Sequence, residues 1–447
     1  MELKGKSCLV IGLGKSGKSA ANLIKRSGGS VTFYKDSPFS VDEIKRMKVD
    51  GFDYVDIEKR DKMILQGCVD LIVISPSISL QSEVVKIAEK RGIKILTEVE
   101  LASCFLTATL VGITGTNGKT TTTSLVEKLI SSDDKRCFAV GNIGVPLTSL
   151  VETLNEKDYI VEELSSFQLE KNEFVKPKIS CILNISVDHM DRHKTMENYI
   201  TAKKNIFKNQ DENDFLVLNF DDEILKSQDI KSSAKVVYFS KLEKVNGAYL
   251  DGENICFGDG EFIVSKNTIR LFGAHNLENA LAAITIAKLL KISNTAIAKG
   301  LSEFKGISHR LQFVKTIDNV KYINDSKATN IDSTIVATNA FDEKITLLLG
   351  GYDSDFDYSE LFEKMSKNVQ RIIVSGANAE KIVNYAKLSG FINIIQTASL
   401  KESVLVARFF ANANEVVLFS PASKSFDLFN NYEERGEKFI EIVESIK

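Results

Sequence analysis

The strongest chemical signal in the chain is a glycine-rich segment that ends in a lysine and two threonines. Residues 114–121 read Thr-Gly-Thr-Asn-Gly-Lys-Thr-Thr and follow an apolar run at 109–113. In such loops backbone N–H groups cradle phosphates, the lysine reaches the β- and γ-phosphates, and the next hydroxyl can hold Mg²⁺. The strict P-loop pattern needs a glycine where this chain has Ile113, so the segment is a variant P-loop. It favours phosphate binding over a solvated turn, by Gly115, Thr116, Asn117, Gly118, Lys119, Thr120 and Thr121.

Acidic and imidazole side chains follow two later apolar runs. Glu163 ends the run that begins at 159, and His189 follows the run at 179–185. Because the carboxyl ends of parallel strands meet at one edge of a sheet, we expect both groups near the P-loop. A carboxylate there can hold Mg²⁺, and the proximity of His193 favours a functional over a structural role for His189. The spacing does not match a zinc site.

A second glycine loop lies near the N-terminus. Gly12-x-Gly-x-x-Gly17 follows an apolar run and precedes a helical pattern, and Asp36 ends the next strand pattern. The glycines allow a tight turn and a close approach to a pyrophosphate, and the acid can bind a ribose hydroxyl. The pattern predicts a dinucleotide-binding fold. NAD is one candidate ligand, the P-loop competes for the nucleotide, and close helix–strand packing alone is the structural alternative.

Further polar residues recur where apolar strands or helices begin and end. Asn276 and Asn279 share one helical face, either as an N-terminal cap or for recognition of a base or phosphate. Lys203 lies in a helical stretch whose periodicity alone places it at the surface. Polar segments at 309–310, 324–330 and 420–427 suggest the docking surface of a second substrate.

The candidate site residues must be positioned by the strands that end beside them. The sequence predicts three α/β units that contain such strands. Strand and helix patterns alternate throughout, which predicts parallel, doubly wound sheets. We expect the units at 1–96, 97–306 and 307–447. Short strands with glycine and asparagine turns after residue 247 predict an antiparallel patch, hence a mixed sheet in the central unit, and residues 311–323 predict a hairpin.

Composition excludes several classes of protein. The 447 residues are 43% hydrophobic and 26% charged, with a net charge of -3, which argues against disorder and against a basic nucleic-acid-binding surface. No apolar run approaches the roughly 20 residues of a membrane helix. Six cysteines without a C-x-x-C pair indicate free thiols in a reducing compartment. With no signal-peptide pattern, the expected location is the cytoplasm.

Taken together, the motifs resemble those of the Mur ligases of bacterial cell-wall synthesis, over nearly the whole chain. The family resemblance rests on the P-loop variant, Asp188-His189, Tyr199-x-x-Ala-Lys203, Gly-x-His275-Asn276-x-x-Asn279, and the spacing from His309-Arg310 to Asp325-Ser-Lys-Ala-Thr329. A D-glutamate-specific subgroup is indicated by Glu163-Leu-Ser-Ser-Phe-Gln168, Asp-His-Met-Asp-Arg, and Ser-Pro-Ala-x-x-Ser425-x-Asp followed by Arg435-Gly436.

The resemblance implies three domains: an N-terminal Rossmann-like domain for a UDP-sugar, a central P-loop ATPase-like domain and a C-terminal Rossmann-like domain. It implies an ATP-dependent ligase of peptidoglycan precursor synthesis that joins D-glutamate to UDP-N-acetylmuramoyl-L-alanine through an acyl phosphate. It also assigns the first glycine loop to a uridine diphosphate rather than to NAD. A monomer is expected, with neither nucleic acid as a partner nor insertion into a membrane.

Roles for individual residues are implied in the same way. The catalytic groups are Lys119, His189 and Lys203. Two Mg²⁺ ions are held by Thr120, Glu163, His189 and a carbamylated Lys203. ATP is contacted by the P-loop and by Asn276, Asn279, Arg310 and Asp325. The UDP substrate is contacted by Ser16, Asp36, Ser37, Asn142, Ser165 and Gln168, and D-glutamate by Lys327, Thr329, Ser425 and Phe426.

The chain departs from the family pattern at two positions. Ser354 stands where a basic residue is usual, and Ser77 where a glycine is usual. Three other functions compete with a D-glutamate ligase: a ligase of related chemistry, such as a folylpolyglutamate synthase or another Mur ligase; a non-enzymatic nucleotide sensor or scaffold; and a nicotinamide oxidoreductase. The N-terminal glycine loop disfavours the folate enzyme, and the presence of Lys119, Glu163, His189 and Lys203 disfavours the sensor.

Overall fold

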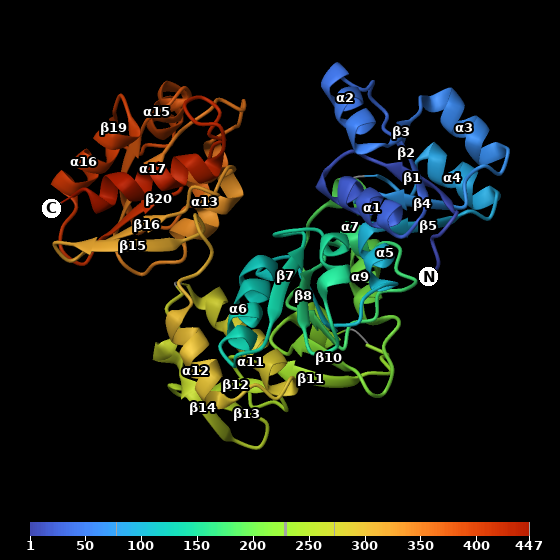
Figure 1. The fold of residues 1–447 in the computed structure, drawn as a ribbon. Coiled ribbons are helices and arrows are strands. Elements are labelled where there is room, and N and C mark those ends of the chain that lie inside the picture. Colours follow the sequence, from blue (N-terminus) through green and yellow to red (C-terminus); the bar gives the residue numbers. More distant parts are fainter. Residues whose placement is uncertain (77, 228–229, 272, 447) are drawn as a thin grey trace. The chain divides into compact units, whose positions relative to one another are not determined.

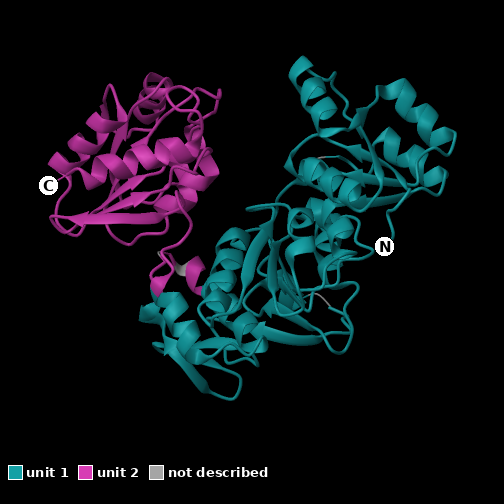
Figure 2. Cartoon of the chain, in the orientation of Figure 1, with its two compact units in different colours: residues 1–268, 278–302 teal, residues 269–277, 303–447 magenta. Residues whose placement is uncertain are grey.

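The computed structural model describes residues 1–76, 78–227, 230–271 and 273–446. The chain forms two compact units, which Figure 2 colours separately. Unit 1 comprises residues 1–268 and 278–302, and unit 2 comprises residues 269–277 and 303–447. The boundaries of the three expected domains remain predictions.

The N-terminal part of unit 1 is a five-stranded parallel sheet in the order β3-β2-β1-β4-β5. Ile11 pairs with both Tyr34 and Ile74, so the loops after β1, β2 and β4 leave the same edge. Helix α1 packs closely because a Cβ on Gly17 would lie 2.1 Å from the Gly12 carbonyl oxygen. The elements are β1 (Ser7–Ile11), α1 (Lys15–Arg26), β2 (Ser30–Tyr34), α2 (Val41–Asp50), β3 (Asp53–Tyr54), α3 (Ile57–Leu65), β4 (Leu71–Ile74), α4 (Glu83–Lys90) and β5 (Lys94–Thr97).

The central part of unit 1 contains a six-stranded parallel sheet in the order β11-β10-β9-β6-β8-β7. Helix α6 packs over β7 and β8 (Figure 1). The first elements are α5 (Glu98–Ser103), β6 (Thr109–Thr114), α6 (Lys119–Ser131), β7 (Cys137–Gly141), the 3-10 turns η1 (Leu147–Ser149) and η2 (Val151–Thr153), β8 (Tyr159–Glu163), α7 (Ser166–Leu169), β9 (Ile179–Ile182), α8 (Met190–His193) and α9 (Met196–Lys204). The next are η3 (Asn205–Phe207), β10 (Phe215–Asn219), α10 (Glu223–Ser227) and β11 (Lys235–Phe239).

The expected antiparallel patch is a separate three-stranded sheet, β12-β13-β14, rather than part of the parallel ladder. A parallel bridge between Ser240 and Tyr249 joins it to the end of β11. The pairs of the six-stranded central sheet are all parallel, so the expected mixed sheet is wrong for this part of the chain, because apart from this bridge the antiparallel strands pair only with one another. Its elements, and the helices that follow, are β12 (Ala248–Asp251), β13 (Asn254–Phe257), β14 (Glu261–Ser265), η4 (Lys266–Thr268), α11 (Ala274–Leu289) and α12 (Asn294–Glu303).

Unit 2 is built on a six-stranded sheet in the order β15-β16-β20-β17-β18-β19. All neighbours are parallel except the hairpin of β15 and β16, which turns at Asp318-Asn319 as the sequence predicts. The elements are β15 (Gln312–Ile317), β16 (Val320–Asn324), α13 (Ile331–Thr338), β17 (Ile345–Leu349), α14 (Ser359–Lys364), β18 (Val369–Val374), α15 (Ala379–Leu388), β19 (Ile394–Gln396), α16 (Leu400–Phe410), β20 (Val416–Phe419) and α17 (Tyr432–Glu444).

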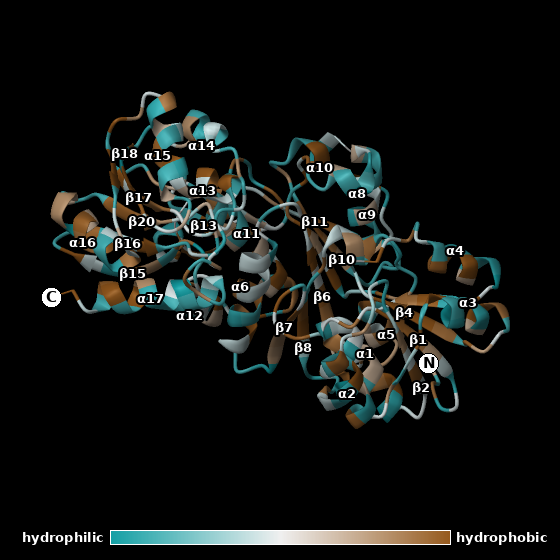
Figure 3. Ribbon diagram, turned by 90° about the horizontal axis from the view of Figure 1, so that it is seen from above, coloured by the Kyte–Doolittle hydropathy of each residue, from teal (hydrophilic) through white to brown (hydrophobic). Residues whose placement is uncertain are grey.

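Apolar packing explains both units. In Figure 3 the strands are predominantly brown, whereas the helices also carry teal, hydrophilic segments. One cluster of buried side chains runs from Leu3 to Ala234 and so includes both parallel sheets of unit 1. Two other clusters, which begin at Ile317 and Ile323, lie entirely within unit 2. The α/β architecture is therefore confirmed. Within the described part of the chain, no helix combines the length and apolarity needed to cross a membrane.

Candidate active site

The P-loop lies between β6 and α6, as predicted. Gly118 adopts a left-handed conformation, with φ of 81°, directly before the helix. A Cβ at this position would lie 2.2 Å from Oδ1 of Asn279 in α11. That amide oxygen also accepts a hydrogen bond from the Thr122 hydroxyl at 3.3 Å. Gly118 is therefore required both for the turn and for the approach of Asn279, one of the residues expected at the nucleotide.

The loop is bound to the segment that follows β9. Backbone N–H groups of Thr116 and Asn117 donate to Asn184, to its carbonyl at 3.0 Å and its Oδ1 at 2.8 Å. The Thr116 hydroxyl lies 3.1 Å from the Tyr199 hydroxyl and accepts from the Ser186 N–H at 3.0 Å. The edge-of-sheet argument for this segment is therefore confirmed, because the residues just before His189 contact the P-loop.

Two lysine amines converge on the carbonyl oxygen of Gly115. Lys119 donates to it at 2.9 Å and Lys203 at 2.7 Å, and Lys119 also donates to the Thr116 carbonyl at 2.7 Å. Burial and the nearby Lys119 charge lower the pKa of Lys203 to about 7, although Asp188 opposes this shift. The helical periodicity is wrong for Lys203, which is 1% exposed, because the P-loop covers that face of α9. Two lysine amines that donate to one carbonyl suit the binding of an anionic ligand nearby.

Glu163 ends β8, and its two carboxylate oxygens differ in their hydrogen bonding. Its Oε1 accepts from Nδ2 of Asn142 at 2.9 Å, and its backbone carbonyl accepts from the Asn142 N–H at 3.0 Å. Its Oε2 is buried and has no hydrogen-bond partner among the described residues. A buried, unpartnered carboxylate oxygen fits a cation. The described residues contain no ready-made cluster of three His, Cys, Asp or Glu ligands, so Glu163 would need other oxygen donors.

His189 has a left-handed backbone, with φ of 54°, at the start of α8. Its ring lies 4.8 Å from the ring of Phe167, and the guanidinium of Arg192 lies 4.4 Å from that same ring. Arg192 is itself held by two 2.8 Å hydrogen bonds to Glu170. It also donates to the carbonyl of Ile78, in the loop after β4, at 3.2 Å. Through these contacts Arg192 positions the Phe167 ring against His189. The same arginine links this segment to the loop after β4 of the N-terminal part.

Two residues expected at the UDP substrate have a local structural role. The Ser165 hydroxyl accepts from the Gln168 N–H at 3.3 Å, while Oε1 of Gln168 accepts from the N–H and hydroxyl of Ser165 at 2.9 and 2.8 Å. This is a capping box at the start of α7. The Ser-x-x-Gln spacing contains that signal, and the sequence interpretation missed it.

Three other residues expected at the UDP substrate lie in the N-terminal part of unit 1. Ser16 is half-buried in the first turn of α1, and Asp36 and Ser37 are exposed after β2. The Asp36 carboxylate accepts from the Tyr34 hydroxyl at 2.7 Å. Ser77, one of the two departures from the family pattern, lies outside the described residues.

The remaining nucleotide residues lie at helix and strand ends. Thr120 is half-buried and Thr121 buried in the first turn of α6, and Asn276 is buried in the first turn of α11. In unit 2, Arg310 is exposed, whereas the Asp325 carboxylate is buried and accepts from the Ser420 hydroxyl at 2.7 Å and the Leu311 N–H at 3.1 Å. Burial raises the pKa of Asp325 to about 7.

The expected amino-acid residues follow β16 and β20, which are neighbours in the sheet of unit 2. Lys327 and Thr329 are half-buried, and the Lys327 amine lies 5.7 Å from the ring centre of Tyr432. Ser425 is buried, whereas Phe426 is 60% exposed. The structure brings these groups to one edge of one sheet, as the strand-end argument predicts.

Two buried charged residues, Arg435 and Glu162, had no role assigned to them from the sequence. Arg435 is 2% exposed, and it donates to the hydroxyl and carbonyl of Ser326 and to the carbonyl of Lys424, at 3.0, 2.8 and 3.1 Å. Glu162 is fully buried with neither oxygen partnered among the described residues, and burial, with the charge of Glu98, raises its pKa well above the usual range. Only the buried strand position of Glu162 could have signalled this from sequence.

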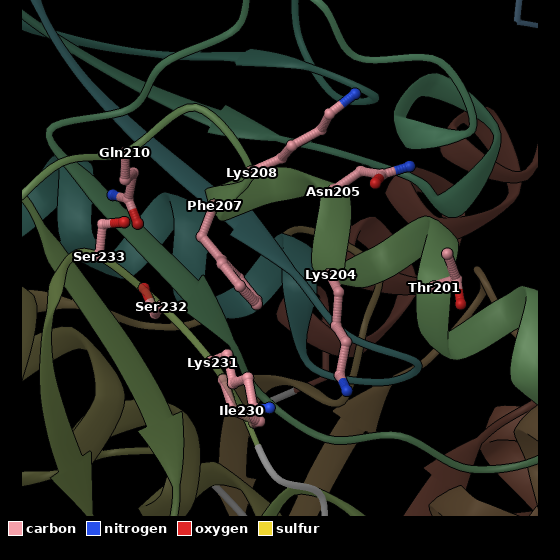
Figure 4. A pocket seen from close by; sticks show the side chains of 10 residues that line it. All are labelled: Thr201, Lys204, Asn205, Phe207, Lys208, Gln210, Ile230, Lys231, Ser232 and Ser233. Atoms are coloured by element: carbon pink, nitrogen blue, oxygen red, sulfur yellow. The ribbon is translucent and has the colours of Figure 1, made fainter.

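A separate cavity of about 400 Å³ borders the other side of α9 (Figure 4). Thr201 and Lys204 line it from the helix, Phe207 from the turn that follows, and Lys231 from the segment before β11. None of the residues expected at the active site lines this cavity.

The chain belongs to the Mur ligase family. The family's MurD-like N-terminal domain matches residues 6–97, its middle domain residues 113–287, and its glutamate ligase domain residues 309–423. Proteins from Clostridioides difficile (strain 630) and Thermoanaerobacter sp. (strain X514), both named UDP-N-acetylmuramoylalanine--D-glutamate ligase, are 41% and 42% identical to it. Each alignment covers 100% of both proteins.

Solved structures of other family members share the fold. MurF from Acinetobacter baumannii has a TM-score of 0.61 at 16% identity, over 97% of this chain and 93% of that chain. MurC, the UDP-N-acetylmuramate-alanine ligase of Thermotoga maritima, has a TM-score of 0.57 at 19% identity, over 99% of this chain and 100% of that chain. At these identities the comparisons concern architecture, and they support the three-domain α/β assignment.

Proposed function

We propose that the protein joins D-glutamate to UDP-N-acetylmuramoyl-L-alanine with conversion of ATP to ADP and phosphate. The observation that carries this proposal is the convergence of Lys119 and Lys203 on the P-loop carbonyl of Gly115, next to the strand that ends in Glu163. The two substrates, the amino acid and the sugar nucleotide, are inferred from the full-length relatives, whose shared name specifies both. That name favours D-glutamate over the substrates of other Mur ligases.

The chemistry requires activation of an unreactive group. A carboxylate is a poor electrophile, so the γ-phosphoryl group of ATP is first transferred to the carboxylate of the alanyl residue, giving an acyl phosphate and ADP. The amine of D-glutamate then attacks the acyl carbon, loses a proton, and displaces phosphate from the tetrahedral intermediate. Positioning and neutralisation of charge dominate such a reaction. Lys119 and the loop amides neutralise the phosphates.

We propose two Mg²⁺ ions, held by Thr120, Glu163, His189 and a carbamylated Lys203. The buried, unpartnered Oε2 of Glu163 supports a cation at that residue. When bound, the ions would offset the charge that develops on the transferred phosphoryl group. The lowered pKa of Lys203 supports carbamylation, because a neutral amine attacks CO₂ and a protonated one does not.

The remaining assignments complete the proposal. Asn276, Asn279, Arg310 and Asp325 contact ATP. Ser16, Asp36, Ser37, Asn142, Ser165 and Gln168 contact the UDP substrate, and Lys327, Thr329, Ser425 and Phe426 contact D-glutamate. We propose further that the protein acts as a monomer in the cytoplasm, with domain boundaries near residues 97 and 307.

The test is release of phosphate by the purified full-length protein with ATP, Mg²⁺ and UDP-N-acetylmuramoyl-L-alanine. We expect turnover that depends on D-glutamate, with L-glutamate and L-alanine as comparisons. Turnover with a different amino acid only would reject the proposed substrate. No turnover with any amino acid, by protein that binds ATP, would reject the proposed activity.

A further inference from the structure

The amino-acid-binding edge of unit 2 is formed by loops after three adjacent strands, β16, β20 and β17. The loop after β17 rests directly on the loop after β20. The N–H of Gly350 donates to the carbonyl of Pro421 at 3.0 Å, and the N–H of Tyr352 donates to the carbonyl of Lys424 at 2.9 Å. A Cβ on Gly351 would lie 2.5 Å from that Lys424 carbonyl oxygen. Residues 350–352 are therefore paired with residues 421–424, and Ser354 follows this paired segment by two positions.

The backbone of Lys424 is held from two sides. Its carbonyl accepts from Tyr352 and from the guanidinium of Arg435 at 3.1 Å. Its neighbours Ser423 and Ser425 are buried, whereas Lys424 itself is exposed. Its ammonium makes no hydrogen bond or ion pair within the described ranges. A fixed backbone with an unengaged cation is a suitable arrangement for binding an anion.

The acids close to Tyr352 and Lys424 in the chain make other contacts. Asp353 and Asp355 pair with Lys381, and Asp427 accepts from the N–H of Ala377. Arg435 is buried, and its hydrogen bonds go to a hydroxyl and two carbonyl oxygens rather than to a carboxylate. A second carboxylate from a substrate would complement the positive charge of Lys424.

An exposed aromatic pair lies beside the same residues. Tyr352 follows Gly351 and Phe426 follows Ser425, and their rings meet edge to face at 6.4 Å. Tyr352 is 44% exposed, which, with the larger exposure of Phe426, leaves apolar surface on a residue that bonds to the Lys424 backbone and on one that follows it by two positions. A short methylene chain that ends in a carboxylate matches an apolar surface followed by a cation.

Position 354, in the loop after β17, carries a serine and no charge. The Ser354 hydroxyl oxygen is buried and has no hydrogen-bond partner among the described residues. We propose that Lys424 binds the side-chain carboxylate of the incoming amino acid and thereby replaces a basic residue at 354. This inference rests on the proposed function and adds a specificity-determining residue to it.

The experiment compares D-glutamate with D-glutamine, which keeps the amine and the α-carboxylate and lacks the second carboxylate. In Lys424→Ala we expect the KM for D-glutamate to rise about tenfold or more, as befits loss of a charge-assisted hydrogen bond. We expect the KM for ATP and for the UDP substrate to change less than twofold. The preference of kcat/KM for D-glutamate over D-glutamine should fall by a similar factor of about ten.

Two further variants sharpen the test. Ser354→Lys placed in the Lys424→Ala background should recover the preference for D-glutamate. Lys438→Ala is the matched control, because Lys438 is an exposed lysine of unit 2 that pairs with Glu441, and it should change nothing. Should Lys424→Ala melt at a lower temperature than the wild type, Lys424→Gln, which keeps most of the stem, replaces it in every comparison.

The outcomes separate the two levels of inference. An active wild type whose Lys424→Ala variant keeps both its KM for D-glutamate and its preference overturns the role of Lys424 and leaves the proposed function intact. A wild type that is inactive with D-glutamate and active with another amino acid overturns the proposed function, and the role of Lys424 with it.

Discussion

At the scale of single residues, the site is defined by charges that burial holds close together. Lys119 and Lys203 share one carbonyl acceptor, and the Oε2 of Glu163 is buried without a partner among the described residues. Such an arrangement is unfavourable when empty of counter-charge, because buried charges are costly unless they are paired. The P-loop is therefore preorganised for a ligand that is itself highly charged.

The first prediction concerns Lys119. Lys119→Ala should reduce kcat/KM by at least about 100-fold, because removing a preorganised charge from a phosphoryl-transfer site commonly costs this much. Initial rates of phosphate release at several ATP concentrations measure the effect. Lys128→Ala, at the far end of the same helix, is the control and should retain activity. Unchanged turnover in Lys119→Ala would contradict the assignment of the nucleotide site.

The second prediction concerns the pH dependence of stability through Asp325. Its folded-state pKa of about 7 lies above the ordinary value of an aspartate, so the folded protein binds the proton more tightly than the unfolded chain. This contribution to stability is complete below pH 4 and is lost as pH rises through about 7. Asp325→Asn keeps the side chain neutral, and the loss of unfolding free energy between pH 5 and pH 8 should shrink.

The expected change for Asp325→Asn is of order 1 to 3 kcal/mol, since each pKa unit corresponds to roughly 1.4 kcal/mol. Urea unfolding at both pH values, followed by circular dichroism, measures it. Asp342→Asn serves as the control, because this residue is exposed and lies on a loop of the same unit. Identical pH profiles for wild type and Asp325→Asn would rule out this account.

At the scale of elements, the turn between β6 and α6 determines what the site can bind. Gly118 has the left-handed backbone and the close contact with Asn279 described above. Helix α6 begins immediately after it, so any shift of this turn also moves Lys119 and Thr120.

The third prediction is that Gly118→Ala raises the KM for ATP at least about tenfold and lowers stability by about 1 to 2 kcal/mol, since a non-glycine residue is strained in this conformation. Gly252→Ala is the matched control. Gly252 has φ of 59° with no atom within 4 Å of an added Cβ, so this variant carries the backbone strain without the clash. Equal KM values for ATP in the two variants would show that the Asn279 contact is unimportant.

At the scale of the whole molecule, the distribution of apolar cores governs cooperativity. One cluster joins the N-terminal and central sheets of unit 1, whereas two clusters belong to unit 2 alone. Ser19 of α1 and Glu98 of α5 also meet at Thr148, whose hydroxyl donates to the carboxylate at 2.6 Å and lies 2.7 Å from the serine hydroxyl.

The fourth prediction is that thermal unfolding is not two-state. Differential scanning calorimetry should show two transitions, one for unit 1 and one for unit 2. UDP-N-acetylmuramoyl-L-alanine should raise the midpoint of the unit 1 transition, because ligand binding stabilises the part that it contacts. A single transition whose calorimetric and van't Hoff enthalpies agree would contradict this division.

The sequence could predict those parts of the site that local pattern determines. The P-loop, Glu163 and His189 follow apolar strands, and parallel pairing is enough to place them at one edge. Lys203 could not be predicted in this way, because its burial depends on the P-loop covering α9. Arg435 is similar: its helix is readable from sequence, but its contacts with Ser326 and Lys424 depend on how the loops after β16 and β20 fold. The Ser165–Gln168 capping box was readable and was missed.

The apolar cluster that runs through the two parallel sheets of unit 1 limits how this chain could be recombined with its relatives. The first 96 residues end within that cluster, so a chimera that exchanged them alone would place foreign side chains against the η1 turn and α5. Such a graft should succeed only when residues 97–103 and 147–153 travel with it. To transfer the preference for a sugar nucleotide between relatives, the N-terminal sheet and the segments packed against it would have to be exchanged together. A junction at residue 96 would separate them.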